Sequence, residues 1–246
     1  MNFNQNAKII QLAVIQILLV IWHTTTAQTY EVKTEVLSDS EKSIIQISSY
    51  TAQGEVIKLK EALYVGLENN LTVNQIKEVL VHIYAYAGFP RSIRGLQTFL
   101  EVLNERKTKG ILEVWGPEAS AINTTIPKYD RGVANLEELI GIPLNGKSDY
   151  QEFSPEIDRF LKEHLFADIF ERDVITYKQR ELVTISVIAS LGTLDPMLKT
   201  HYGLSLNVGW QPEQLIEFTD IIRITSGDDK FKSAHDLLIQ VLNSRN

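Results

Sequence analysis

The chain repeats part of itself, and this internal repeat constrains its fold more than any other feature. Residues 59–106 align without a gap with residues 198–245, and eleven of the aligned pairs are identical. Each residue of the first copy aligns with the residue 139 positions later, and we call this constant difference in numbering the repeat offset. Most of the other pairs keep their polarity, as Ile76 does with Leu215. An ungapped match of this length indicates a duplicated helical module, with a chance likeness between two amphipathic stretches as the alternative.

The first copy carries the pattern of an amphipathic helix. Thr72 and Gln75 have the spacing of a capping box, in which each side chain bonds the other residue's backbone amide. Apolar residues then recur with helical period up to Gly88, which is expected to end the helix before Pro90. These signals predict a helix over residues 73–87.

The second copy predicts several helices in succession. Thr176 and Gln179 form another capping box ahead of a helix over residues 180–191, and Gly192 ends it. Start signals and apolar stripes predict three further helices, over 195–206, from 212 onward and over about 231–242. Because alternating strand patterns are scarce, the predicted fold class is all-α, built as a duplicated helical bundle.

Residues 107–150 interrupt this regularity. Eight Gly and Pro residues fall in this stretch, with one short helical pattern near residues 135–140. We interpret it as a loop-rich connection. The predicted organisation is therefore a signal peptide, a first module, the connection and a second module, over residues 1–27, 28–106, 107–150 and 151–246.

The N-terminal segment over residues 1–27 has the pattern of a secretory signal peptide. Lys8 precedes a mostly apolar stretch over residues 9–22, and Thr25 and Ala27 fit the small residues ahead of a cleavage site. One alternative is a membrane anchor, but this stretch spans only about 21 Å as a helix against a hydrocarbon core of about 30 Å. Another is a buried helix, although the stretch is apolar all round. We expect cleavage after Ala27 and export to the periplasm or the medium.

Composition excludes several classes of function. The chain has no cysteine, which removes disulfides, thiolate nucleophiles and cysteine zinc sites. Its formal charge of −7 argues against a nucleic-acid partner. We expect no cofactor, and no membrane span once the signal peptide is removed.

Two stretches hold candidate catalytic residues. Glu78, His82 and Tyr86 are spaced four residues apart and line one edge of a helix, where an acid and a phenol would hold the imidazole for proton transfer. Glu181 and His201 lie on consecutive predicted helices, so antiparallel packing would bring the carboxylate and the imidazole together. In both stretches the alternative is a Glu–His pair that stabilises the fold and takes no part in catalysis.

At these residues the chain resembles the carboxymuconolactone decarboxylase-like proteins, relatives of the alkylhydroperoxidase D-like proteins, in a tandem form. The resemblance covers roughly residues 40–106 and 156–242. The matching runs are FLKEHLFADIF at 160–170, QRELVTISVIASLG at 179–192 and NNLTVNQIKEVLVHIYAYAGFP at 69–90.

The resemblance implies an all-α bundle that assembles as trimers or hexamers. The peroxidase branch uses a Glu, a C-x-x-C pair and a His, and these positions match Glu181, Leu194, Met197 and His201. Since neither leucine nor methionine supplies a thiolate, this chain cannot reduce peroxides by the thiol mechanism of that branch. In the first module the position of His201 is Ala62, so the resemblance implies one site per chain, to which His82 would contribute.

The decarboxylase branch needs no cysteine, and it implies a small acidic or carbonyl substrate. Glu–His pairs and Tyr86 would supply the proton after loss of CO₂, and Arg180 would hold a carboxylate.

Three hypotheses remain open. The first is an exported acid/base enzyme with Glu181, His201 and His82 as catalytic residues and Tyr86 and Arg180 as substrate-binding residues. The second is a ligand-binding or scaffold protein that kept the fold and lost the chemistry. The third is a metal-assisted enzyme in which His82, His201 and Glu181 bind a divalent ion.

Overall fold

The computed structural model describes residues 36–245, and all regular structure in that range is helical. The predicted signal peptide over residues 1–27 lies outside the described residues. Within residues 36–245, no helix combines the length and the apolar character needed to cross a membrane. The all-α fold class is confirmed.

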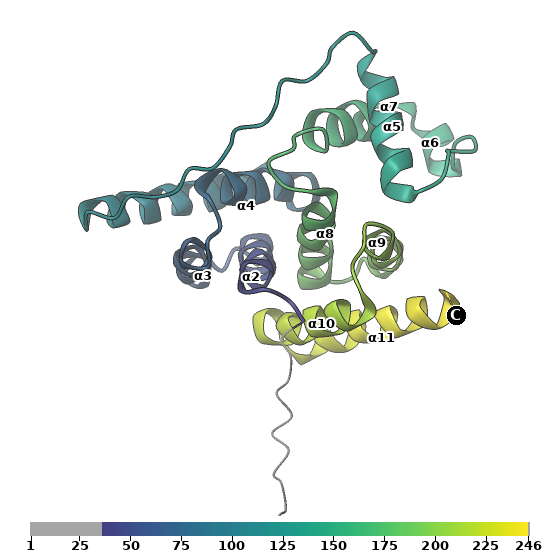
Figure 1. The fold of residues 1–246 in the computed structure, drawn as a ribbon. Helices are drawn as coiled ribbons and strands as arrows, with labels where there is room; N and C mark the ends of the chain where they lie inside the picture. The colour runs from purple at the N-terminus through teal and green to yellow at the C-terminus, as the bar shows by residue number, and fades with distance from the viewer. Residues whose placement is uncertain (1–35, 246) are drawn as a thin grey trace, which may run out of the picture. The chain divides into compact units, whose positions relative to one another are not determined.

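Three helices form the first part of the structure (Figure 1). They are α2 (Asp39–Gln53), α3 (Val56–Glu68) and α4 (Val73–Thr108). The predicted capping box of Thr72 and Gln75 is present at the start of α4. Gly88 breaks α4, with φ of 81° and ψ of 161°, but helix resumes directly after it instead of ending there. Pro90 is tolerated because it falls in the first turn after the break, where its missing N–H would have had no partner.

Four helices form the last part. They are α8 (Tyr177–Leu191), α9 (Asp195–Asn207), α10 (Pro212–Ser226) and α11 (Asp228–Arg245). The predicted starts at Asp195 and Pro212 agree with these bounds. The capping box of Thr176 and Gln179 is present, but α8 begins at Tyr177, three residues before the predicted start at 180, and α11 extends beyond the predicted 231–242 at both ends.

The repeat offset recurs in the helix boundaries. Both ends of α9 are the repeat equivalents of the ends of α3, and α10 begins at the equivalent of the start of α4. Gly227, the counterpart of Gly88, takes φ of 89° and ψ of 172°. Backbone bonds follow the same offset, since Leu71 donates to Gly66 and Trp210 donates to Ser205.

Residues between the two parts are more helical than the sequence predicted. An extended stretch leads from α4 to α5 (Lys128–Ile140), whose start precedes the expected helical piece near residue 135. The short α6 (Asp149–Phe153) and α7 (Pro155–Arg159) follow, and then η1 (Phe160–Ile169), a π-helix. Leu139, Phe166 and Phe170 form a small apolar cluster that joins α5 to this π-helix region.

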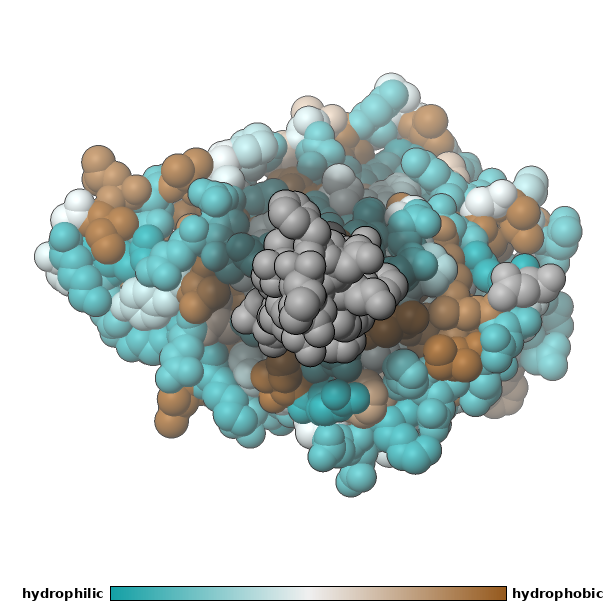
Figure 2. Space-filling view, turned by 60° about the horizontal axis from the view of Figure 1, so that its bottom comes forward, coloured by the Kyte–Doolittle hydropathy of each residue, from teal (hydrophilic) through white to brown (hydrophobic). Residues whose placement is uncertain are grey.

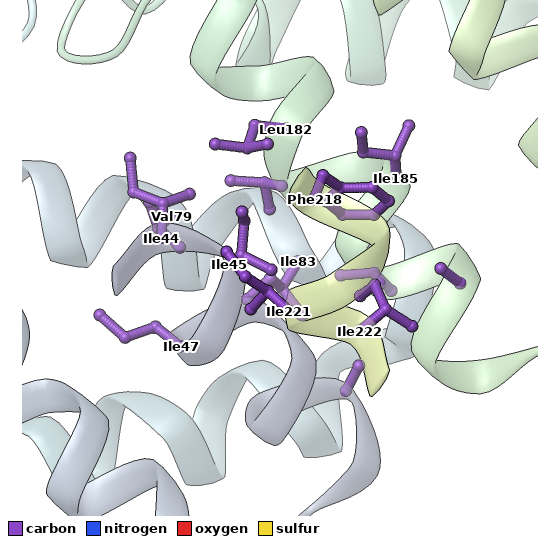
Figure 3. Packing of buried hydrophobic residues seen from close by; sticks show 14 of the residues in the cluster. Ile44, Ile45, Ile47, Val79, Ile83, Leu182, Ile185, Phe218, Ile221 and Ile222 are labelled. Carbon is purple, nitrogen blue, oxygen red and sulfur yellow. The ribbon is translucent and has the colours of Figure 1, made fainter. Parts of the chain in front are cut away.

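The main core lies where α2 and α8 pack against each other (Figure 3). α4 packs on α8, and α10 packs on α2. The labelled side chains of Ile45, Ile83, Leu182 and Phe218 come from these four helices and meet in one cluster. Full burial of one such side chain stabilises the fold by about 1.5–3 kcal/mol. This packing fixes α8 against α4 and thereby positions the candidate site.

Candidate active site

The predicted pair of Glu181 and His201 is formed. The two side chains come from α8 and α9, and His201 Nδ1 lies 2.8 Å from Glu181 Oε2. Because a carboxylate accepts hydrogen bonds, Nδ1 carries the proton and Nε2 is left for another partner. Glu181 is fully buried, whereas the His201 side chain is 17% exposed. Glu181 Oε1 is buried and has no hydrogen-bond partner among the described residues.

Tyr86 reaches the same place from α4. Its ring meets the His201 ring edge-on, with centroids 6.0 Å apart. Burial raises the pKa of Tyr86 and the charge of Glu181 raises it further, while a hydrogen bond with Thr184 partly offsets both. The phenol therefore stays protonated at neutral pH and is a hydrogen-bond donor beside the pair.

His82 contacts the site from a position closed to solvent. Its Nδ1 lies 3.3 Å from Arg180 Nη1, which only donates, so Nδ1 accepts. Its Nε2 therefore carries the proton and lies 3.0 Å from Thr184 Oγ1, which in turn donates to the Arg180 carbonyl. Burial and the charge of Arg180 lower the pKa of His82 well below its usual value. The imidazole is thus a neutral group with both nitrogens engaged, 5.3 Å by ring centroid from Tyr86.

The acid expected beside His82 pairs with arginine instead. Glu78 Oε1 accepts from Arg180 Nη2 at 2.7 Å, and Arg172 Nε lies 3.0 and 3.1 Å from the two carboxylate oxygens of Glu78. Arg180 is fully buried, and its terminal nitrogens are taken up by Glu78, His82 and the Arg172 carbonyl. A substrate-binding role for Arg180 stays a prediction, and this geometry favours a role in holding His82.

The sequence did not single out three residues of this network. Thr184 bonds His82, Phe170 stacks edge-on against His82 with centroids 5.3 Å apart, and Arg172 bonds Glu78. Thr184 lies one helical turn after Arg180, so helical spacing alone would have placed it on the same face. Arg172 and Phe170 follow η1 and come from far along the chain, and no local spacing indicates their contact with α4.

The equivalent place in the first part of the structure lacks the pair. α2 and α8 are both 15 residues long and begin after the caps Ser38 and Thr176, so Glu181 corresponds to the buried Ser43, and His201 corresponds to Ala62 by the repeat offset. Where the resembled peroxidases carry cysteines, the chain has Leu194 and Met197, both exposed at the start of α9.

The first and the last part of the structure each have a cavity at an equivalent position, and neither cavity is lined by Glu181 or His201. Leu194, Leu198 and Lys230 help to line a cavity of about 230 Å³, and one of about 240 Å³ lies at the equivalent place in the first part.

A metal-binding cluster is absent from the part of the chain that the structure describes. No three His, Asp or Glu side chains in residues 36–245 are grouped so as to hold a metal ion. His82, His201 and Glu181 are therefore not such a group, because both nitrogens of His82 already face Arg180 and Thr184.

Residues 155–239 match the model of the carboxymuconolactone decarboxylase family. This part of the chain is a domain of that family. The matched residues contain all of α8, α9 and α10, and therefore both Glu181 and His201. No curated protein matches the chain.

Proposed function

We propose that the chain is an acid/base enzyme, with decarboxylase or lactone-type chemistry on a small acidic or carbonyl substrate. The observation that carries the proposal is the hydrogen bond between the buried Glu181 and the partly exposed His201. A carboxylate on Nδ1 fixes the orientation of the imidazole, so that Nε2 faces outward and can give or take a proton.

The proposed step is a decarboxylation in which the C–CO₂ bond breaks. Its electron pair moves toward the substrate carbonyl and forms an enolate, and CO₂ leaves. The carbon then takes a proton from Nε2 of His201 in its cationic form, which carries a proton on each ring nitrogen. Solvent returns that proton to the imidazole. The Tyr86 hydroxyl, kept protonated by burial and by Glu181, would donate a hydrogen bond to the enolate oxygen. His82, neutral and closed to solvent, would position Thr184 and not transfer protons itself.

The test is turnover of a panel of small β-keto acids and unsaturated lactone carboxylates, followed by CO₂ release. We expect His201→Gln and Glu181→Gln to lower kcat at least 100-fold while the circular dichroism spectrum is kept. His164→Gln is the matched control, because His164 also bonds a carboxylate, Asp168, at 2.9 Å, but on the surface. Unchanged turnover in His201→Gln would reject the proposal.

A second candidate is a non-catalytic ligand-binding or scaffold protein. It is favoured by the first part of the structure, where the same helical arrangement persists with Ser43 and Ala62 in place of the pair. It predicts that no panel substrate is turned over and that His201→Gln changes only the stability. Calorimetric binding of a panel acid without turnover would support it.

Three wider features belong to the same proposal. Duplication of one module is supported by the helix boundaries and backbone bonds that recur at the repeat offset. Export, with cleavage after Ala27, is supported by the sequence pattern alone, and N-terminal sequencing of the purified protein tests it. Assembly of several copies is implied by the resemblance, which predicts a trimer.

A further inference from the structure

The cavity of about 240 Å³ in the first part of the structure lies where the start of α3 faces the stretch of α4 after Gly88. Val56 and Leu59 contribute apolar walls, and the side chains of Arg91 and Arg94 also line it. No acidic residue in the described part of the chain lines this cavity. Apolar side chains reach the surface elsewhere as well, scattered among hydrophilic ones (Figure 2), so apolar exposure alone does not mark a site. The two arginines are what distinguish this cavity.

Arg91 has its hydrogen-bond donors free. Its guanidinium lies against Gly54, which has φ of 77° at the end of α2, and a Cβ atom at Gly54 would overlap Arg91 Nη1. The counterpart of Arg91 in the last part is Lys230, whose Nζ donates to the Leu191 carbonyl at 2.7 Å at the end of α8. The Arg91 side chain makes no such hydrogen bond, and no ion pair, with any residue from 36 to 245. Its N–H groups are therefore available to a ligand.

Arg94 is held only loosely. Its Nη1 lies 3.5 Å from Glu101 Oε1, and the two side chains are 48% and 50% exposed. An exposed pair of this kind contributes little to stability, because water solvates both charges and screens their attraction. Turning the guanidinium of Arg94 from Glu101 toward an anion in the cavity therefore costs little.

The acids nearest in the chain lie outside the cavity. Burial raises the pKa of Tyr50, and the charges of Glu61 and Glu55 raise it further, so both carboxylates lie near that phenol. Lys58 Nζ lies 5.8 Å from the centroid of the same ring and offsets part of their charge. Because neither Glu55 nor Glu61 lines the cavity, the charges closest to a ligand inside it are those of the two arginines.

The fold does not require arginines at this place. The equivalent cavity in the last part is lined by Asp195, Asp229 and Lys230, and by a serine at the position that corresponds to Arg94. Two acids and one lysine thus line that cavity, against two arginines and no acid in the first part. Equivalent helices enclose cavities of similar size with opposite charge, so packing does not explain the arginine pair.

We propose that the cavity in the first part binds a small organic anion, with its carboxylate between the guanidinium groups of Arg91 and Arg94 and its apolar body against Leu59. The planar fork of an arginine matches the two oxygens of a carboxylate. A cavity of about 150 Å³ holds benzene, so about 240 Å³ has room for a single ring with its carboxylate. Neither Glu181 nor His201 lines this cavity, so the inference is independent of the proposed acid/base function.

Isothermal titration calorimetry with benzoate tests the proposal on the purified protein. We expect one site per chain with a Kd of about 1 mM or lower, and no binding of benzamide, which has a similar size and no charge. Arg91→Gln and Arg94→Gln should each raise the Kd at least about 10-fold, because each removes a charged donor to the carboxylate. Lys230→Gln in the equivalent cavity is the matched control and should leave the Kd unchanged. Thermal unfolding shows that each variant is folded.

Two further variants locate the site. Val56→Asp places in the cavity the acid that the last part carries at the equivalent position, and it should abolish binding. Because α9 begins at Asp195, an aspartate at the start of α3 is expected to leave the fold intact. His201→Gln should leave the Kd for benzoate unchanged, since that side chain does not line the cavity.

Several results would overturn the proposal. They are a wild-type protein that binds no benzoate, equal binding of benzamide, and benzoate binding that both arginine variants keep. Loss of binding in His201→Gln would also overturn it and would assign the acid to the candidate active site. Loss of binding in Lys230→Gln would overturn it as well and would assign the acid to the cavity in the last part.

Discussion

Replacing Glu78 with glutamine removes the charge that balances a buried arginine. Glu78 accepts from Arg180 at 2.7 Å and from Arg172 at 3.0 and 3.1 Å, and both Glu78 and Arg180 are buried. Removing one partner of a buried pair costs about 3–5 kcal/mol, because the remaining charge stays desolvated and unpaired. We expect Glu78→Gln to lower the free energy of unfolding by about that amount. Arg172 adds little to the loss, because it is partly exposed and regains water.

Urea unfolding at neutral pH, followed by circular dichroism, measures this change. Asp236→Asn is the matched control, because its ion pair with Lys232 at 2.7 Å is exposed to solvent and contributes little to stability. The double variant Glu78→Leu with Arg180→Met removes both charges and should recover most of the loss. A loss below about 1 kcal/mol in Glu78→Gln would refute the reasoning, since Arg180 would then have another source of solvation.

Three further predictions concern other parts of the fold. Phe218→Ala should cost about 3–5 kcal/mol in urea unfolding, because Phe218 is fully buried in the main core. His82 should stay in the Nε2–H tautomer in nitrogen NMR spectra down to pH 6. Because its folded pKa is lowered, stability should fall below about pH 6.5, by up to about 1.4 kcal/mol per pH unit, and His82→Gln should remove that slope. Burial opposes ionisation of Asp158, but hydrogen bonds from Lys162, Lys147 and Tyr129 outweigh it and hold its pKa at about 2. That stabilisation is present above about pH 4 and is lost between pH 4 and 2. Asp158→Asn should therefore reduce the fall in the urea midpoint of unfolding as the pH drops through this range.

Local signals in the sequence predicted the helices well. The capping boxes at Thr72 and Thr176 form as expected, because their hydrogen bonds join residues only three positions apart. The restart of helix after Gly88 was missed, since a glycine before a proline usually marks an end. The π-helix at residues 160–169 carries no distinctive local pattern, so apolar periodicity did not reveal it.

The candidate site was only partly predictable. Glu181 and His201 lie on consecutive helices joined by a short turn, and antiparallel packing was sufficient to expect their contact. The partner of His82 was not predictable in this way. Glu78, one helical turn away on the same helix, was the expected partner, but Arg180 supplies the bond from another helix. Contacts between residues so far apart in the sequence depend on how α4 and α8 pack, and spacing within one helix carries no information about them.

The sequence by itself determined the all-α class, most helix starts, the lack of thiol chemistry and the residues available for proton transfer. These follow from local hydrogen bonds, periodicity and side-chain chemistry. Only the tertiary structure decided which of those residues meet and which are open to a ligand. Packing of α4 on α8, together with Phe170 and Arg172 from the segment after η1, closes His82 and Arg180 to solvent, and it leaves His201 partly exposed beside Tyr86. The difference arises because burial is a property of the whole packed chain, and desolvation decides whether a titratable group is held neutral, paired or free to react.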